Sequence, residues 1–422
     1  MKDILKNDLG EEKVRVILHV DLNNFYASVE MKLNPSLEGK FIGVCGNAEN
    51  RHGIILAKSE NAKKMGVKTG MTILEAKRLC PEIVLVEANH AHYLSYSKMA
   101  RNLYREYTDK IEPFGIDECW LDVTDSVKLF GSGEAIADQI RERTKKELGL
   151  TVSVGVSFNK VFAKLGSDLK KPDGTTVIDK NNYKTVVWNL PAQDLLFVGK
   201  STAQKFKKIN ISTIGDLANT DVKYLEKRFG KWGVALHDYA NGKDNSPVLY
   251  DNEEDEIKSV GNSITSYRDL RSDEDVKILF TVLSESVSSR LISYGLGKAT
   301  TLSIYVRDEF LASSTRQGKL KTPSVLPEDF MSFAFELFKK NYDFSRGIRT
   351  IGLSVSHFVS DGEQISFDDG AYDKKLKLNS AISNIKDKYG NKSVLKGIVL
   401  KDKKLMRENP EEDHEIHPEG HL

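Results

Sequence analysis

Two adjacent carboxylates interrupt a run of residues that otherwise favours a strand. Asp117 and Glu118 lie within FGIDECWLDVT, residues 114–124, whose other members are mostly apolar or β-branched. Neighbouring side chains on a regular strand point to opposite faces, so both acids can face one site only from a turn or bulge. We therefore expect a hairpin with Asp117 and Glu118 at its tip.

A third acid, Asp21, follows the apolar run VRVILHV and precedes a predicted helix in LNNFYASVEMKL. Functional residues collect where a strand ends in a turn, so we expect Asp21 to converge with Asp117 and Glu118. Three clustered carboxylates repel one another unless a cation holds them, and hard oxygen ligands favour Mg²⁺. A pair of metal ions serves in-line displacement at phosphorus, which favours phosphoryl or nucleotidyl transfer. The alternative is one solvated acid beside a partner paired with Lys or Arg.

The whole-chain composition indicates an ordinary multidomain protein. A length of 422 residues suits about two to four domains. The 62 basic and 61 acidic residues nearly cancel, so any site for a polyanion must be local. Three cysteines, Cys45, Cys80 and Cys119, lack CxxC spacing and argue against a disulfide framework or zinc site. No apolar run approaches the ~18 residues of a membrane span, so we expect no membrane association and a cytoplasmic location.

The periodicity divides the chain into segments of different type. Strand and helix patterns alternate up to residue 158, and a lysine-rich stretch, NKVFAKLGSDLKKPDG, follows the alternating strand TVSVGVSF. Short helices are expected from 188 to 243. An acidic linker, DNEEDE, then precedes an α+β segment over 257–361.

Three motifs together resemble a known family. VDLNNFYASVE (residues 20–30), FGIDECWLDVT and VSVGVSFNKVFAKLGSDLKKPDG (residues 152–174) are similar, in order and spacing, to the main motifs of Y-family translesion DNA polymerases. The resemblance covers about residues 14–360. It implies an α+β, multidomain right hand, with a mixed palm sheet, small fingers, a helical thumb and an α+β little finger. The implied boundaries are palm 1–32 and 92–167, fingers 33–91, thumb 168–243 with a helix-hairpin-helix-like segment, linker 244–257, little finger 258–361, and a charged, partly disordered tail 362–422.

The resemblance implies a chemistry for the clustered acids. Asp21, Asp117 and Glu118 would hold two Mg²⁺ ions, with the backbone carbonyl of Leu22 as a further ligand. The reaction would be template-directed addition of dNTPs to the 3′-OH of primer-template DNA, in low-fidelity translesion synthesis. A palm-type nucleotidyl cyclase is one alternative, although it would need no DNA-binding domain after a linker. A non-catalytic DNA-binding accessory protein is the other, although it would have no reason to keep three costly acids.

The resemblance also assigns the nucleotide contacts. Tyr26 would be the steric gate against a ribose 2′-OH, Phe25 would flank the nucleotide, and Lys160 would contact the triphosphate. The family usually has a Tyr and an Arg where this chain has Glu60 and Lys63. Lys63 keeps the charge but lacks the bidentate fork of arginine. Either Lys58, Lys63 or another nearby base holds the phosphates, or affinity for the triphosphate is lower.

The remaining implied contacts concern DNA and a protein partner. Backbone NH groups near Gly199 and Lys200 would hold a DNA phosphate at a helix start. Basic residues of the little finger would meet phosphates without reading sequence: Arg316, Lys319 and Lys321. GEQISFDD, residues 362–369, resembles a sliding-clamp-binding peptide through Gln364, Ile365 and Phe367. We expect the protein to be a monomer.

Overall fold

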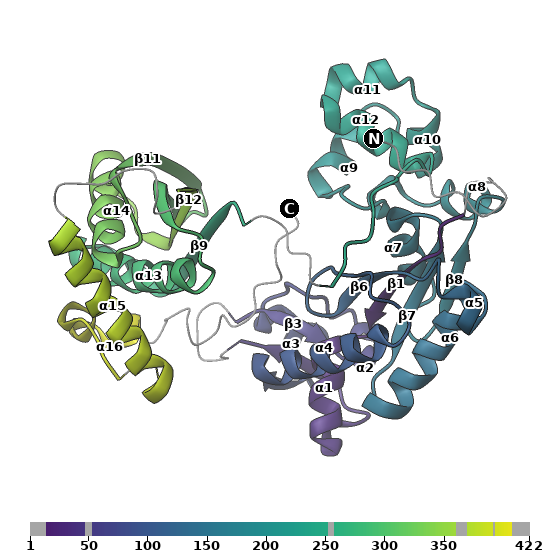
Figure 1. Cartoon of the computed structure of the whole chain (residues 1–422), viewed down its shortest axis with the longest axis horizontal. Coiled ribbons are helices and arrows are strands. Elements are labelled where there is room, and N and C mark those ends of the chain that lie inside the picture. Colours follow the sequence, from purple (N-terminus) through teal and green to yellow (C-terminus); the bar gives the residue numbers. More distant parts are fainter. Residues whose placement is uncertain (1–13, 47–52, 252–256, 360–368, 391–392, 407–422) are drawn as a thin grey trace. The chain divides into compact units, whose positions relative to one another are not determined.

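The computed structural model describes residues 14–46, 53–251, 257–359, 369–390 and 393–406 (Figure 1). These residues form two compact units, the first containing 14–46 and 54–251 and the second 257–359 with the C-terminal helices. Each unit has its own apolar core. Within the described ranges, no helix has both the length and the hydropathy that crossing a membrane requires.

A five-stranded mixed sheet forms the centre of the first unit. Its strand order is β5-β6-β1-β7-β8, with bounds β5 Ile111–Pro113, β6 Glu118–Asp122, β1 Ile17–Leu22, β7 Val152–Ser157 and β8 Thr175–Ile178. The middle strand, β1, is antiparallel to both β6 and β7, whereas β7 and β8 are parallel. This sheet matches the mixed palm sheet that the sequence predicts.

Alternation along β1 separates a core face from a polar face. Leu18, Val20 and Leu22 enter the main core, which also contains residues of three helices. These helices are α1 (Phe25–Leu33), α4 (His90–Arg105) and α6 (Gly133–Arg143). The opposite face carries His19 and Asp21 and is covered by α7 (Lys160–Leu169).

Helix α7 lies unusually close to the sheet. A Cβ added to Gly155 of β7 would come within 1.9 Å of the Ala163 carbonyl oxygen, so only glycine permits this approach. Asn159 caps the helix by accepting a hydrogen bond from the Phe162 NH. The cap and the close approach together fix which residues of α7 reach the polar face of the sheet.

A small sheet occupies the range predicted as fingers. Its strand order is β3-β2-β4, with bounds β2 Ile42–Cys45, β3 Ile55–Lys58 and β4 Val84–Glu87. Two helices accompany it, α2 (Glu60–Lys64) and α3 (Ile73–Leu79). Ile55, Ala62 and Ala76 belong to its separate small core.

Short helices follow β8 and form a third apolar cluster around Phe206. Their bounds are α8 Tyr183–Val187, α9 Lys200–Lys207, α10 Ile214–Asn219, α11 Val222–Phe229 and α12 Lys231–Ala240. The remaining short elements of the first unit are η1 Pro35–Leu37, α5 Val127–Phe130, η2 Thr144–Leu148 and η3 Ala192–Asp194.

The second unit is an antiparallel sheet packed with two long helices. Its strand order is β11-β10-β12-β9, with bounds β9 Ser259–Leu270, β10 Lys298–Asp308, β11 Ser313–Ser324 and β12 Ile348–Val359. Helices α13 (Asp273–Ser293) and α14 (Pro327–Asn341) share one core with the sheet. This is the α+β architecture that the sequence predicts for the little finger.

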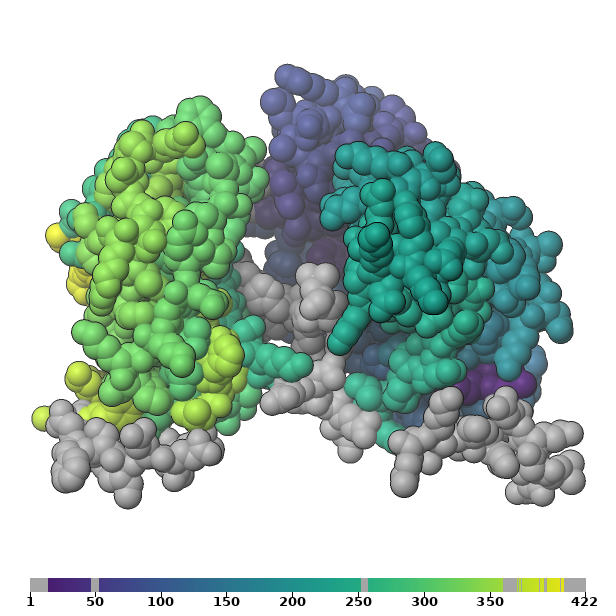
Figure 2. Space-filling view, turned by 90° about the horizontal axis from the view of Figure 1, so that it is seen from above, coloured from purple at the N-terminus to yellow at the C-terminus, as the bar shows by residue number. Residues whose placement is uncertain are grey.

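Part of the segment predicted as a charged tail packs on this second unit. It contains α15 (Asp369–Tyr389), η4 (Gly397–Lys401) and α16 (Lys403–Met406). Val399 and Leu405 are buried in the core of the unit. In the space-filling view, yellow-green atoms of the C-terminal segment lie against the green atoms of the same unit (Figure 2).

Candidate active site

Strand pairing brings the predicted acids together. The register of β1 and β6 places Asp21 directly opposite Glu118. Asp117 immediately precedes β6, and its carbonyl accepts a hydrogen bond from the Leu22 NH at 3.0 Å. The turn between β5 and β6 contains Gly115 at φ 89°, a conformation that glycine favours. The predicted hairpin is therefore present, with Asp117 and Glu118 beside its turn.

Two lysines from the α7 segment lie on these acids. Lys164 Nζ is 2.8 Å from Glu118 Oε2 and 3.6 Å from Asp21 Oδ2. Lys171 Nζ is 2.6 Å from Asp21 Oδ2. Asp168 pairs with both ammonium groups, at 3.5 Å from Lys164 and 2.8 Å from Lys171. Neither lysine is among the residues predicted for the site, although both stand in the lysine-rich motif NKVFAKLGSDLKKPDG.

The lysines compensate the acidic charge only in part. Burial, Glu118 and Asp21 raise the pKa of Asp117 to about 7. Burial and Glu118 also raise the pKa of Asp21, although Lys171 and Lys164 act in the opposite direction. The cluster thus retains a tendency to bind further positive charge.

The acids are suitable donors for a hard cation but do not form a closed cage. The described part of the chain contains no ready-made group of three or more His, Cys, Asp or Glu arranged to hold a metal. Mg²⁺ is usually bound by one or two carboxylates together with substrate phosphates. An open set of carboxylate oxygens therefore fits a metal that is completed by a phosphate-bearing substrate.

A buried histidine, His19, lies next to the acidic cluster. His19 Nδ1 is 2.9 Å from Ser167 Oγ, which itself donates to the Lys164 carbonyl at 2.7 Å. Ser167 must therefore accept from the imidazole, so in the neutral ring the unprotonated Nε2 lies 3.3 Å from Glu118 Oε2 without a hydrogen bond between them. Burial keeps the pKa of His19 well below its usual value. The sequence signal for His19 was a polar residue in an apolar strand, two positions before Asp21.

The Tyr26 ring is held by aromatic neighbours. It stacks on Tyr93 with centroids 4.0 Å apart and an interplanar angle of 8°, and His90 lies edge-on to it. Tyr93 donates to Glu30 at 2.6 Å, which fixes the stacking partner. Burial and the Asp117 charge raise the pKa of Tyr26 to about 12, so its hydroxyl is neutral. Phe25, predicted to flank the nucleotide, is a buried residue whose ring lies beside that of Tyr26, and its contact with a nucleotide stays a prediction.

Lys160 does not reach the acidic cluster. Its ammonium pairs with Glu112 and lies 4.6 Å from the centroid of the Trp120 ring. Both members of this ion pair are largely buried, with side chains 13% and 9% exposed. The prediction that Lys160 contacts a triphosphate is therefore not supported, because Glu112 and Trp120 occupy its charged end. Lys63, the other predicted base, pairs with Glu60 at 3.3 Å.

The predicted DNA contacts lie on exposed positions. Gly199 is the N-cap of α9 and Lys200 its first residue, with no side-chain cap among the described residues. Lys319 and Lys321 share one face of edge strand β11, and Arg316 lies on the other because its register partner is the buried Ile304. The predicted clamp-binding residues, Gln364, Ile365 and Phe367, lie outside the described residues.

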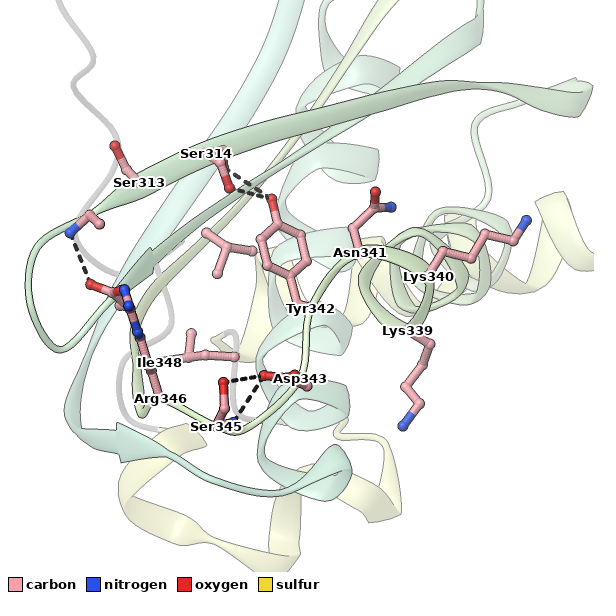
Figure 3. A pocket seen from close by; sticks show the side chains of 13 residues that line it. Ser313, Ser314, Lys339, Lys340, Asn341, Tyr342, Asp343, Ser345, Arg346 and Ile348 are labelled. Atoms are coloured by element: carbon pink, nitrogen blue, oxygen red, sulfur yellow. Dashed lines mark hydrogen bonds and ion pairs between the residues drawn. The ribbon is translucent and has the colours of Figure 1, made fainter.

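A cavity of about 600 Å³ belongs to the second unit (Figure 3). It lies among the end of β10, the start of β11 and the C-terminus of α14. Tyr342 hydrogen-bonds Ser314 in its wall, and Arg346 pairs with Asp308 at 3.0 Å. Lys339 and Lys340 pair with Asp273 and Glu336. These charged side chains of the lining thus already have ion-pair partners. None of the predicted catalytic residues lines this cavity.

Comparison with known proteins gives consistent matches along the chain. Residues 20–168 match the model of the impB/mucB/samB family, and 257–367 match the C-terminal domain of that family. Residues 193–244 match a thumb domain described for DNA polymerase iota.

Whole proteins and solved structures agree with these domain matches. A DNA polymerase IV of Acetivibrio thermocellus is 50% identical over 397 residues, which cover 93% of this chain and 99% of that protein. A DNA polymerase IV of Clostridium kluyveri is 36% identical over 400 residues, covering 92% and 99%. A Y-family polymerase chimera of Dbh and Dpo4 has a TM-score of 0.72 at 27% identity, covering 82% of this chain and all of that one. An insertion ternary complex of Dbh has a TM-score of 0.56 with the same identity and coverage.

Proposed function

The chain belongs to the impB/mucB/samB family of Y-family DNA polymerases, and from this premise we propose that Asp21, Asp117 and Glu118 form its catalytic centre. The chain is a DNA-directed DNA polymerase of the translesion type. The observation that carries the proposal is the pairing of Asp21 opposite Glu118, with Asp117 at the adjoining turn. Strands β1 and β6, with the turn before β6, thus bring three carboxylates together at one end of these strands.

Membership of this family implies dependence on a divalent metal. We propose two Mg²⁺ ions, held by the three carboxylates and by the backbone carbonyl of Leu22. When bound, the metal would neutralise phosphate charge and favour the ionised form of the attacking primer hydroxyl. The donor set supports this because it consists of hard oxygens, and burial together with their mutual repulsion raises the pKa of Asp117.

Lys164 and Lys171 are the bases placed to meet the triphosphate. Burial acts against their charge, but the neighbouring carboxylates hold the pKa of both ammonium groups above the usual value. Each ammonium group is a compact point charge that can leave its carboxylate partner and pair with a phosphate oxygen. We therefore assign to this pair the role that the sequence had given to Lys160.

Tyr26 supplies the selection for a deoxyribose sugar. Its ring is fixed by Tyr93 and His90, so it cannot easily move away from a bulkier sugar. A ribose 2′-OH would meet this ring, whereas deoxyribose would not. The substrates are accordingly dNTPs and primer-template DNA, in keeping with the Dbh ternary complex. The sliding clamp as partner and the monomeric state stay predictions.

Primer extension with Mg²⁺ tests the catalytic centre. The wild type should extend a primer according to its template, and the isosteric double variant Asp117→Asn, Glu118→Gln should lose more than about 100-fold in rate. Glu142→Gln, an exposed acid on α6, is the matched control and should retain the wild-type rate. An active double variant would contradict the proposal.

The same preparation separates the alternative functions. Incubation with ATP or GTP without DNA should give no cyclic nucleotide. Formation of a cyclic nucleotide without templated extension would instead support the cyclase. Binding of primer-template DNA by a wild type that is inactive with Mg²⁺ would support the accessory protein.

A further inference from the structure

One hydrogen bond joins the start of α1 to the start of α2. The Asn24 side-chain amide donates to Glu60 Oε1 at 2.9 Å, across 36 positions of sequence. Asn24 is the N-cap of α1, and Glu60 is the first residue of α2. The contact therefore links the helix that carries Tyr26 to the small sheet of the fingers.

The backbone of Asn24 determines how α1 begins. Asn24 has φ 49° and ψ 40°, a left-handed conformation that asparagine tolerates better than most residues. Among the described residues its side chain makes no capping bond to α1, and its amide nitrogen donates to Glu60. Its carbonyl accepts the Ser28 NH at 3.0 Å and so starts the helix. The first turn of α1, which starts at this residue, contains Tyr26.

The residue before Asn24 is anchored elsewhere. Asn23 donates to Thr151 Oγ1 at 3.2 Å and accepts from Ser153 Oγ at 2.9 Å. These bonds hold the end of β1 to β7, but they do not act on the α1 side of the turn. The hydrogen bond between Asn24 and Glu60 fixes the other side of this turn, where α1 begins and where Tyr26 lies in the first helical turn.

Glu60 is suited to this role because it is ionised. Its partial burial would raise its pKa, but the Asn24 hydrogen bond and the charges of Lys63 and Lys58 lower it overall. A bound triphosphate would compete with Glu60 for the Lys63 ammonium. The hydrogen bond from Asn24 is a separate contact of Glu60 that does not depend on Lys63.

We propose that Glu60 is a positioning residue for the sugar gate. By accepting the Asn24 hydrogen bond it holds the first turn of α1, so that the Tyr26 ring blocks a ribose 2′-OH. The inference rests on the proposed gate role of Tyr26. It gives a function to the acid that stands where the family usually has a tyrosine.

Single-nucleotide insertion tests the proposal through the ratio of kcat/KM for a dNTP to that for the matching rNTP. Glu60→Ala removes the acceptor and Asn24→Gly removes the donor while permitting the left-handed backbone, so each should lower the ratio about tenfold. Glu60→Gln keeps an oxygen acceptor and should stay within about twofold of the wild type. Loss of the Glu60 charge alone would change KM for both nucleotides equally and leave the ratio unmoved.

A double variant shows whether Glu60 acts through Tyr26. Tyr26→Ala should itself abolish most discrimination, and adding Glu60→Ala should then lower the ratio no further. A wild-type ratio in Glu60→Ala, with Tyr26→Ala showing the expected loss, would overturn the inference and leave the gate intact. An unchanged ratio in Tyr26→Ala would overturn the gate and the inference with it. Thermal unfolding of each variant checks folding, and Asn24→Gly gives the answer if Glu60→Ala does not fold.

Discussion

At the scale of single residues, two lysines of different exposure partly compensate the charge of the acidic centre. The Lys164 side chain is 14% exposed and is wedged between Glu118 and Asp21, whereas Lys171 is 27% exposed and reaches Asp21 from beyond the end of α7. Because Lys171 is more exposed, its ammonium group can contact an incoming triphosphate with a smaller rearrangement than Lys164 would need. Lys171 should therefore contribute more to nucleotide binding, and Lys164 more to the arrangement of the acids.

Substitution of Lys171 tests this assignment. Lys171→Met removes a charge-assisted contact worth about 1.5–3 kcal/mol, so kcat/KM for a dNTP should fall about 10–100-fold, mainly through KM. Lys170→Met, at the exposed neighbouring position, is the control and should change kcat/KM by less than about twofold. Steady-state insertion kinetics measure both. Equal kinetics for the two variants would remove Lys171 from the nucleotide site.

The sequence predicted the acids but not their basic partners, for a physical reason. Asp21, Asp117 and Glu118 are placed by strand pairing, and alternation makes strand faces readable from sequence. Lys160 and Lys164 are one helical turn apart, about 5.4 Å. Only the close packing of α7 on Gly155 decides which of them meets Glu112 and which meets Glu118. Neither the composition of the motif nor its hydrophobic periodicity indicates how α7 packs on Gly155.

At the scale of elements, residues 244–251 form a strap across the palm sheet. Val248 is buried against Ile17, Trp120 and Ala163. The Leu249 NH donates to Glu112 Oε2 at 3.1 Å, and the Lys160 NH donates to Asp244 at 3.2 Å. The Lys160–Glu112 ion pair thus lies at the meeting point of β5, α7 and the strap.

A double-mutant cycle measures how strongly this ion pair holds the three elements. Breaking a buried pair leaves one charge uncompensated, so Lys160→Met or Glu112→Gln alone should lower the free energy of unfolding by about 3–5 kcal/mol. Glu112→Gln still offers an acceptor to the Leu249 NH. The double variant should be less destabilised than the sum of the single variants, because no unpaired charge remains.

The exposed pair Lys340–Glu336 is the control for this cycle. These residues lie four positions apart on α14 with side chains 65% and 43% exposed, so their coupling should be about 0.3–0.5 kcal/mol. Chemical denaturation of the single and double variants gives both couplings. Additive effects at Lys160 and Glu112 would show that the pair does not hold the strap.

The strap also shows what composition cannot predict about an element. The sequence indicates a linker over 244–257 from its acidic, polar residues, and these residues are concentrated after 251. The preceding residues include Val248, whose burial depends on a hydrophobic contact site formed by three distant segments. The β5–β6 hairpin, by contrast, was predictable because its glycine turn and its alternation are local.

At the scale of the whole molecule, the C-terminal segment extends the second unit. The charged composition predicts a partly disordered tail over 362–422, yet within the described part of this range charged residues anchor the segment. Asp402 pairs with Arg268 at 3.0 Å, and Lys386 pairs with Glu285 at 2.8 Å. Two sparse apolar residues, Val399 and Leu405, complete the contact by entering the core. Sparse anchors of this kind give no periodic signal, so their burial could not be predicted.

Two leucines of this segment provide a matched test of that organisation. Leu405 is fully buried, whereas Leu400 is 50% exposed, and both lie in the same C-terminal segment. Leu405→Ala should lower the free energy of unfolding of the second unit by about 2–4 kcal/mol, because it removes buried methyl groups and leaves a cavity. Leu400→Ala should change it by less than about 0.5 kcal/mol. Denaturation of the full chain, with the transition of each unit followed separately, distinguishes the two. If both variants unfold alike, the segment does not belong to the core, and the second unit ends at β12.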